Sequence, residues 1–188
     1  MLETDRLWIR NFEIEDAPSC LEGWGKDINL GKYILGYPMR EAEMESFVKA
    51  LSENKNAWVI VEKESRKCIG YITVTIPYIR LGIGEIGYVI GERYQHKGYA
   101  YESVDCILQE YLAVRGLYMM EAKYSANNLA SGNLLHRLGF RIDGELRDRR
   151  IDIRTGSRSN LVVCSVTREE KFPPSQAKEY KKTIWEGV

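Results

Sequence analysis

Apolar residues recur along the chain with two spacings, and each spacing predicts a kind of secondary structure. Short apolar or alternating runs that end at turn residues are typical of β-strands. Such runs predict strands at residues 7–10, 57–62, 68–76, 85–90, 118–125, 140–146, 149–154 and 161–166. Apolar residues three and four apart predict helices from about residue 16 and at residues 41–51, 101–115 and 129–138. We expect Pro77 to end the strand before it, because proline cannot donate to a sheet ladder.

The order of these elements predicts an α/β fold with a mixed sheet. The first half reads as consecutive antiparallel strands, whereas the second half alternates strands with helices. A strand–helix–strand unit requires a parallel, right-handed crossover, so we expect helices on both faces of one sheet. The predicted domain covers residues 1–167, and residues 168–188 read as a tail. Ile184 and Trp185 could pin this tail to the body or to a second subunit, which leaves a homodimer open.

The composition argues against several classes of function. The 188 residues carry 27 basic and 27 acidic side chains, so no net charge favours DNA or an anionic membrane. The four cysteines lie far apart and form no CxxC pair, so we expect no zinc site and no bound metal. No apolar run is as long as a membrane span, and the N-terminus lacks the apolar core of a secretory signal. We therefore expect a cytoplasmic protein.

The stretch from Gln95 to Ala100 carries the first candidate chemistry. It joins the strand at residues 85–90 to the helix that follows, and it contains Gly98. The first-turn N–H groups of a helix have no intrahelical partner, and the helix dipole favours an anion beside them. Gly98 lets the backbone approach a ligand closely, and Lys97 adds positive charge. The pattern indicates a phosphate site, and its alternative is an ordinary glycine turn before a helix.

Four segments of the chain, in this order and spacing, resemble the GNAT superfamily of N-acetyltransferases. Within it, they resemble in particular the ribosomal-protein N-terminal acetyltransferase group (RimJ/RimL-like). The segments are residues 2–7 (LETDRL), 68–72 (CIGYI), 85–100 (EIGYVIGERYQHKGYA) and 128–140 (NLASGNLLHRLGF). Each segment alone is a weak signal, but the four together are specific. Glu145, Arg147 and Asn160 stand where the C-terminal hairpin of that group begins and returns.

The resemblance implies a mostly antiparallel sheet with a V-shaped splay, and acetyl-CoA as the co-substrate. The backbone at Val89 or Ile90 would then hold the pantetheine arm and polarise the thioester carbonyl. The N–H groups of the glycine turn would hold the pyrophosphate. The implied cofactor-binding residues are Tyr88, Val89, Ile90, Gln95, His96, Lys97, Gly98, Tyr99, Ala100, Tyr101, Asn128 and Ser131.

Two residues are candidates for the acid–base work of acetyl transfer to an amine. Glu85, at a strand start, is the candidate base for the amine proton, and its alternative is a solvated charge. Ser131 is the candidate acid or hydrogen-bond donor to the departing thiolate, and its alternative is a local helical hydrogen bond. Asn128 could bind pantetheine, cap the helix, or do both. Many family members place a tyrosine where this chain has Leu135, so the identity of the acid stays open.

Together these patterns predict an acetyl-CoA-dependent N-acetyltransferase that transfers the acetyl group directly to a primary amine, without a covalent enzyme intermediate. The resemblance implies that the acceptor is a protein N-terminal α-amine, as in a ribosomal protein. A small amine, such as a polyamine, an aminoglycoside or an amino acid, is an alternative acceptor. A domain of this fold that binds acyl-CoA without turnover is an alternative of another class.

Overall fold

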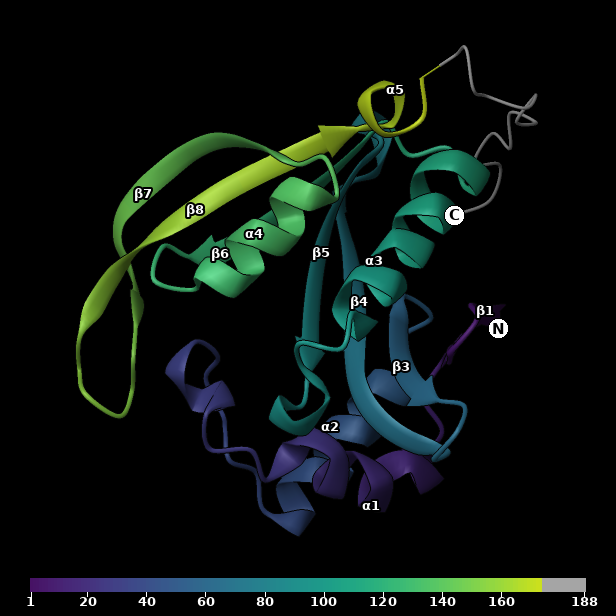
Figure 1. Cartoon of the computed structure of the whole chain (residues 1–188), viewed down its shortest axis with the longest axis vertical. Helices are drawn as coiled ribbons and strands as arrows, with labels where there is room; N and C mark the ends of the chain where they lie inside the picture. Colours follow the sequence, from purple (N-terminus) through teal and green to yellow (C-terminus); the bar gives the residue numbers. More distant parts are fainter. Residues whose placement is uncertain (174–188) are drawn as a thin grey trace.

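The computed structural model describes residues 1–173, and of Tyr78 the backbone only. Its centre is an eight-stranded sheet in the spatial order β1-β2-β3-β4-β5-β6-β8-β7 (Figure 1). The strands are β1 (Leu2–Glu3), β2 (Leu7–Arg10), β3 (Ala57–Glu62), β4 (Lys67–Tyr78), β5 (Ile83–Ile90), β6 (Met119–Ser125), β7 (Arg141–Ile151) and β8 (Arg158–Thr167). Neighbouring strands are antiparallel except for β5 and β6, which confirms the expected mixed sheet. Ile184 and Trp185 lie outside the described residues.

Helices cover both faces of the sheet, as the crossover pattern predicts. One face carries α1 (Ala17–Cys20), its π-helical continuation η2 (Leu21–Gly25) and α2 (Glu41–Ser52). The other face carries α3 (Tyr99–Leu108), its π-helical continuation η6 (Gln109–Val114) and α4 (Leu129–Arg137). The remaining short helices are η1 (Ile14–Asp16), η3 (Leu30–Lys32), η4 (Ile79–Leu81), η5 (Glu92–Tyr94) and α5 (Arg168–Lys171).

Two apolar cores follow from the two-residue period of the strands, because alternate side chains point to opposite faces. Ile86 and Ile90 of β5 pack in the core under α3 and α4. Val89 of the same strand packs in the core under α1 and α2. Residues at even and odd positions of β5 therefore enter different environments, which decides where each candidate side chain of that strand points.

The predicted end of the second strand of the series is wrong. β4 does not stop before Pro77 but continues to Tyr78. Its pairing with β5 shifts register between Thr75 and Tyr78. Proline is tolerated at such an irregularity, because no ladder hydrogen bond has to be donated there. β4 therefore remains beside β5 along almost the whole of β5.

The two strands predicted at residues 140–146 and 149–154 are one strand, β7. Its register against β8 shifts between Leu146 and Arg150, and Asp148 within this bulge has a φ of 55°. Asn160 of β8 holds the bulge: its Oδ1 accepts the Asp148 N–H at 3.1 Å, and its amide donates to Glu145 at 2.6 Å. A bulge bends a strand without ending it. The alternation of apolar and polar residues is therefore interrupted at this bulge, although the strand continues.

The first residues after the predicted domain boundary pack on the body. The Lys171 ammonium donates to the Leu138 carbonyl at 3.1 Å and forms an ion pair with Asp105 at 2.7 Å. Phe172 packs against the core under α3 and α4. Residues 168–173 therefore form part of the packed structure that surrounds the end of α4.

Candidate active site

The parallel junction of β5 and β6 opens into a gap. The two strands pair from Ile83 opposite Met119 to Ile86 opposite Ala122, and their pairing stops there. β5 nonetheless continues to Ile90 against β4, while β6 continues against β8. The strands separate beyond this point (Figure 1). This is the V-shaped splay that the resemblance implied.

The alternation of hydrogen bonds along β5 decides which backbone groups face the gap. The Gly91 N–H donates to the Ile69 carbonyl, 2.9 Å away at the end of the β4–β5 ladder. Hydrogen-bonded pairs alternate along an antiparallel ladder, so the Val89 N–H also points to β4. The N–H groups of Tyr88 and Ile90 point the other way, toward the gap. Of the two expected donors, Ile90 is therefore the one directed into the gap, and Tyr88 joins it.

The segment between Ile90 and α3 is shaped for an anion. Gln95 begins it by donating from Nε2 to the Ile90 carbonyl at 2.9 Å. His96 and Gly98 have left-handed φ values of 60° and 84°, so neighbouring N–H groups curve toward one side. α3 then begins at Tyr99, and no acceptor within residues 1–173 takes the N–H groups of its first turn. These groups are available to a phosphate.

Two basic side chains border this turn. Arg6 donates from Nη1 to the Lys97 carbonyl at 2.9 Å, and its guanidinium lies 4.5 Å from the centre of the Tyr99 ring. Glu102 fixes Arg6 through an ion pair of 2.6 Å. Lys97 is exposed, and its ammonium lies over the Tyr94 ring. Sequence analysis missed Arg6, because nothing in the pattern shows that residue 6 comes to lie beside residue 97.

Glu85 lies on the face of the sheet opposite to α3 and α4. Its carboxylate forms an ion pair with Lys123 of β6, with 2.7 Å between Oε2 and Nζ, and the two side chains are 35% and 34% exposed. The parallel register places Glu121 opposite Glu85 on this face. Thr75 and Gly87 nearby are exposed, so the described helices leave this stretch uncovered. Glu85 is therefore accessible to solvent but has a cationic partner, which the sequence did not indicate.

Ser131 and Asn128 lie at the first turn of α4. The Asn128 Oδ1 accepts the Ser131 N–H at 3.2 Å, which confirms the capping role of Asn128. The Ser131 hydroxyl lies 2.7 Å from the hydroxyl of Tyr88. Burial raises the pKa of Tyr88 to about 12, so this phenol is neutral near neutral pH. Leu135, one turn further along α4, is fully buried in the core.

Some predicted side chains point away from the gap. Tyr99 is buried, and its hydroxyl donates to Glu62, so the backbone of Tyr99 is the part that faces the turn. Val89 packs under α1 and α2, on the far side from the turn. The imidazole of His96 is exposed, and so is that of His136. The remaining cofactor-binding positions lie on β5, in the glycine turn, and at the starts of α3 and α4, and their binding roles stay predictions.

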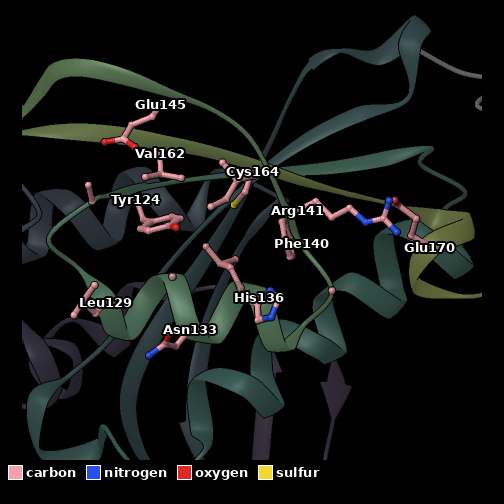
Figure 2. A pocket seen from close by; sticks show the side chains of 15 residues that line it. Tyr124, Leu129, Asn133, His136, Phe140, Arg141, Glu145, Val162, Cys164 and Glu170 are labelled. Atoms are coloured by element: carbon pink, nitrogen blue, oxygen red, sulfur yellow. The ribbon is translucent and has the colours of Figure 1, made fainter.

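A separate hollow of about 860 Å³ lies between α4 and the β7–β8 hairpin (Figure 2). Tyr124, Val162 and Cys164 line it from the sheet, and His136 lines it from α4. None of the described residues that line it belongs to β5 or α3. This hollow is therefore distinct from the gap between β5 and β6.

Neither a reactive thiol nor a metal cluster accompanies the gap within residues 1–173. All four cysteines are free, and the buried Cys164 donates from its thiol to the Ala122 carbonyl at 3.4 Å. Burial raises the pKa of Cys164 to about 12, so its nucleophilic thiolate form is scarce near neutral pH. No group of three or more acidic, histidine or cysteine side chains could hold a metal in this part of the chain. Nor does it contain a helix of the length and apolarity needed to cross a membrane.

The chain is similar in sequence to proteins of one family. Residues 6–141 match the family model described as an acetyltransferase (GNAT) domain. A Bacillus subtilis (strain 168) protein named Uncharacterized N-acetyltransferase YnaD is 31% identical over 144 residues, which cover 76% of this chain and 84% of that protein. The ribosomal protein uS5-alanine N-acetyltransferase of Escherichia coli (strain K12) is 33% identical over 63 residues, 34% of this chain and 32% of that protein.

Solved structures share the fold. An acetyltransferase (GNAT family) from Bacillus anthracis has a TM-score of 0.80 at 22% identity, covering 90% of this chain and 99% of that chain. The Microcin C7 self immunity acetyltransferase MccE, in complex with acetyl-CoA and AMP, has a TM-score of 0.74 at 21% identity, covering 87% of this chain and 93% of that chain. At these identities the likeness concerns the fold alone.

Proposed function

The chain belongs to the GNAT family of N-acetyltransferases, and on that premise we propose which reaction it catalyses. It transfers the acetyl group of acetyl-CoA directly to a primary amine in a ternary complex, and its acceptor is the α-amine of a protein N-terminus. The gap between β5 and β6 carries the proposal, because backbone N–H groups point toward it and a turn suited to an anion follows the end of β5. In acetyl-CoA the pantetheine arm runs from the pyrophosphate to the thioester, which fits this order of groups.

The backbone supplies most of the proposed cofactor site. The turn at His96 and Gly98, with the start of α3 and the charge of Lys97, suits a pyrophosphate. The N–H groups of Tyr88 and Ile90 suit the carbonyl oxygens of the pantetheine arm and of the thioester, where negative charge develops during transfer. Acetyl-CoA in this place acts as a co-substrate and brings the reactive thioester to the gap.

Glu85 is the proposed base, and its ion pair bears on the choice of acceptor. A lysine or polyamine ammonium has a reference pKa of about 10.4, whereas an α-amine has one of about 7.7–8.0. A fully charged amine has to compete with the Lys123 ammonium for the Glu85 carboxylate. A much larger fraction of an α-amine is already neutral near neutral pH. Such an amine depends less on displacing the Lys123 ammonium from the Glu85 carboxylate. The geometry therefore favours an α-amine over a strongly basic amine.

Three further observations support direct transfer to a protein. Cys164, the buried thiol hydrogen-bonded beside the end of the β5–β6 pairing, is held in its protonated form, so it is a poor acyl acceptor. The surface around Glu85 is uncovered, which admits the end of a polypeptide. The Escherichia coli relative is named for an alanine of a ribosomal protein, and this supports a protein acceptor.

The proposal is tested by thiol release from acetyl-CoA with matched acceptors. We would compare peptides that begin with alanine or serine, the same peptides with a blocked α-amine and one internal lysine, and spermidine and an aminoglycoside. We expect the free peptides to show the highest kcat/KM and the blocked peptides to show none. Thermal shift with CoA, measured in parallel, reports cofactor binding without an acceptor.

Three other results would each remove a different part of the proposal. A higher kcat/KM for spermidine or the aminoglycoside would overturn the protein acceptor and leave the transferase reaction. Binding of CoA without acetylation of any amine would indicate a carrier or sensor of acyl-CoA. The absence of a thermal shift at millimolar CoA would overturn the cofactor site itself.

A further inference from the structure

The side chains of Tyr88 and Ser131 connect β5 to the first turn of α4. Their hydroxyl oxygens lie 2.7 Å apart, and the two residues are 43 positions apart in the chain. The even position of Tyr88 in β5 directs its side chain to the face that carries α4. Both residues are partly buried. The side chain of Tyr88 therefore contacts the residue expected beside the thioester sulfur.

The first turn of α4 holds Ser131 firmly in this position. Asn128 accepts the Ser131 N–H, and it also accepts the Gly132 N–H through its main-chain carbonyl at 3.1 Å. Gly132 packs so closely on the Tyr124 ring that a Cβ there would lie 2.9 Å from a ring carbon. The backbone of Ser131 is consequently fixed, and the direction of its hydroxyl is set by its hydrogen-bond partner Tyr88.

We propose that Tyr88 is a positioning residue: its hydroxyl donates to the Ser131 oxygen, so that the Ser131 proton is free to point at the sulfur of CoA. A hydroxyl carries one proton and two acceptor sites, so a serine that accepts from tyrosine keeps its own proton for a third group. This inference rests on the proposed function, because it needs a thioester in the gap. It assigns the Tyr88 side chain a role separate from that of its backbone N–H.

The chemistry balances without a proton transfer from Ser131. The amine nitrogen forms a bond to the acetyl carbon, the carbon–sulfur bond breaks, and the electron pair of that bond goes to sulfur. The amine proton leaves through Glu85 or through water on the uncovered face of the sheet, opposite to α3 and α4. Ser131 stabilises the charge on sulfur by a hydrogen bond, which is stronger to an anion than to a neutral group. The released thiolate takes a proton from solvent.

Two charges that could reverse this direction are remote or absent. The Tyr88 phenol is protonated near neutral pH, because burial raises its pKa to about 12. Burial also raises the pKa values of the nearby Tyr124 and Cys164 side chains. Glu85 lies on the other face, where it pairs with Lys123. The ratio of wild-type to Tyr88→Phe turnover should therefore stay constant between about pH 6 and 10.

The test measures the ionisation of bound CoA as well as turnover. CoA labelled with carbon-13 beside the sulfur is titrated on the wild type, Tyr88→Phe, Ser131→Ala and the double variant, with the chemical shift as readout. Tyr124→Phe is the matched control, because it removes a neighbouring phenol that packs on the same turn. Thermal shift with CoA shows that each variant is folded and binds.

We expect the pKa of the bound thiol to be lower in the wild type than in Tyr88→Phe and Ser131→Ala by about half a unit to one unit. We expect kcat to fall about five- to tenfold in Tyr88→Phe with an unchanged KM for acetyl-CoA, which is the loss of one neutral hydrogen bond. The double variant should be no worse than Ser131→Ala, and Tyr124→Phe should equal the wild type.

The inference is overturned if Tyr88→Phe leaves the thiol pKa and kcat unchanged, or if its effect multiplies with that of Ser131→Ala. A loss of melting temperature in Tyr88→Phe with normal thiol titration would show that the contact only ties β5 to α4. If the wild type does not bind CoA at all, the proposed function fails first and this inference falls with it.

Discussion

Glu85 and Tyr88 are three positions apart on β5, yet they meet different surroundings. Glu85 is about one-third exposed and forms an ion pair with Lys123 across the parallel junction. Tyr88, on the opposite face, is partly buried and neutral, and it shares a hydrogen bond with Ser131. The two-residue period of one strand thus places an open, charged group and a closed, uncharged group at one gap. The open face can admit an acceptor and release a proton, while the closed face orients a hydroxyl.

The two contacts also differ in how easily they are exchanged. Partly exposed ion pairs contribute about 0.2–1 kcal/mol, so Lys123 can yield its place to another cation at small cost. A buried donor or acceptor that loses its partner costs about 1–3 kcal/mol. Tyr88 and Ser131 therefore form the more fixed of the two contacts. The contact on the open face is therefore the more easily exchanged, and the contact on the closed face is the more firmly held.

The largest test of the open face is Glu85→Gln. Loss of a positioned base lowers turnover by about 10²–10⁴-fold near neutral pH, with acetyl-CoA affinity nearly unchanged. The defect should shrink at high pH, where the amine arrives deprotonated. Steady-state kinetics across pH measures this, with Glu121→Gln as the control, because Glu121 is the neighbouring acid on the same face. Equal turnover of Glu85→Gln and wild type at every pH would reduce Glu85 to a surface charge.

On the cofactor side, Gly98→Val should abolish CoA binding. The φ of 84° is strained for valine, and its Cβ would lie 3.3 Å from the Arg6 guanidinium. The stabilisation of about 2.7 kcal/mol expected at a CoA concentration 100-fold above Kd should be lost. Differential scanning fluorimetry with and without CoA measures it. Gly144→Val is the control, because a Cβ at Gly144 meets nothing within 4 Å. An undiminished shift in Gly98→Val would place the pyrophosphate elsewhere.

Asn128→Ala separates folding from binding on the same side. Loss of the side-chain cap on the Ser131 N–H should lower the free energy of unfolding by about 1 kcal/mol. Chemical denaturation without ligand measures this, and calorimetry measures CoA affinity separately. Asn127→Ala, with an exposed side chain outside the helix, is the control. A stability loss with unchanged affinity would leave Asn128 as a cap and remove it from the pantetheine site.

The smallest effect is expected for Lys123→Met, which breaks the ion pair and leaves Glu85 free. If an amine acceptor has to displace this ammonium, the KM for the acceptor should fall about two- to fivefold, in line with an ion pair worth up to about 1 kcal/mol. The effect should be larger for spermidine than for an N-terminal peptide. Lys26→Met removes a more exposed ion pair at the end of η2 and serves as the control. A raised KM would show that Lys123 itself binds the acceptor.

The features that sequence predicted well are local ones. The strand at residues 83–90, the turn around Gly98 and the helix after it depend on neighbouring residues, so a short window contains their whole signal. The splay followed from the family resemblance. By contrast, the pairing of Glu85 with Lys123 joins residues 38 apart, and the contact of Arg6 with Lys97 joins residues 91 apart. Such contacts depend on register and topology, which no single-sequence pattern states.

One choice that the resemblance left open and one wrong strand boundary have the same cause. The resemblance did not decide whether the N–H of Val89 or that of Ile90 faces the gap. The hydrogen-bond pattern between β4 and β5 decides it, because it directs the Val89 N–H to β4. The break between the expected strands of the C-terminal hairpin reflects a bulge that Asn160 holds from the partner strand. In both cases the deciding partner lies on another strand.

The four residue pairs that join β5 to β6 have a mechanical meaning. Within residues 1–173 the sheet consists of two blocks of fully paired strands, β1 to β5 and β6, β8 and β7. Only the short parallel pairing between β5 and β6 joins the edges of these two blocks. Because β5 and β6 are paired at one end and apart at the other, their junction can act as a hinge. Any molecule that connects the two strands at the unpaired end would stiffen this hinge. A cofactor bound there would connect the two blocks, so the molecule that brings the acetyl group would also set the angle between the block that carries Glu85 and the block that carries Lys123.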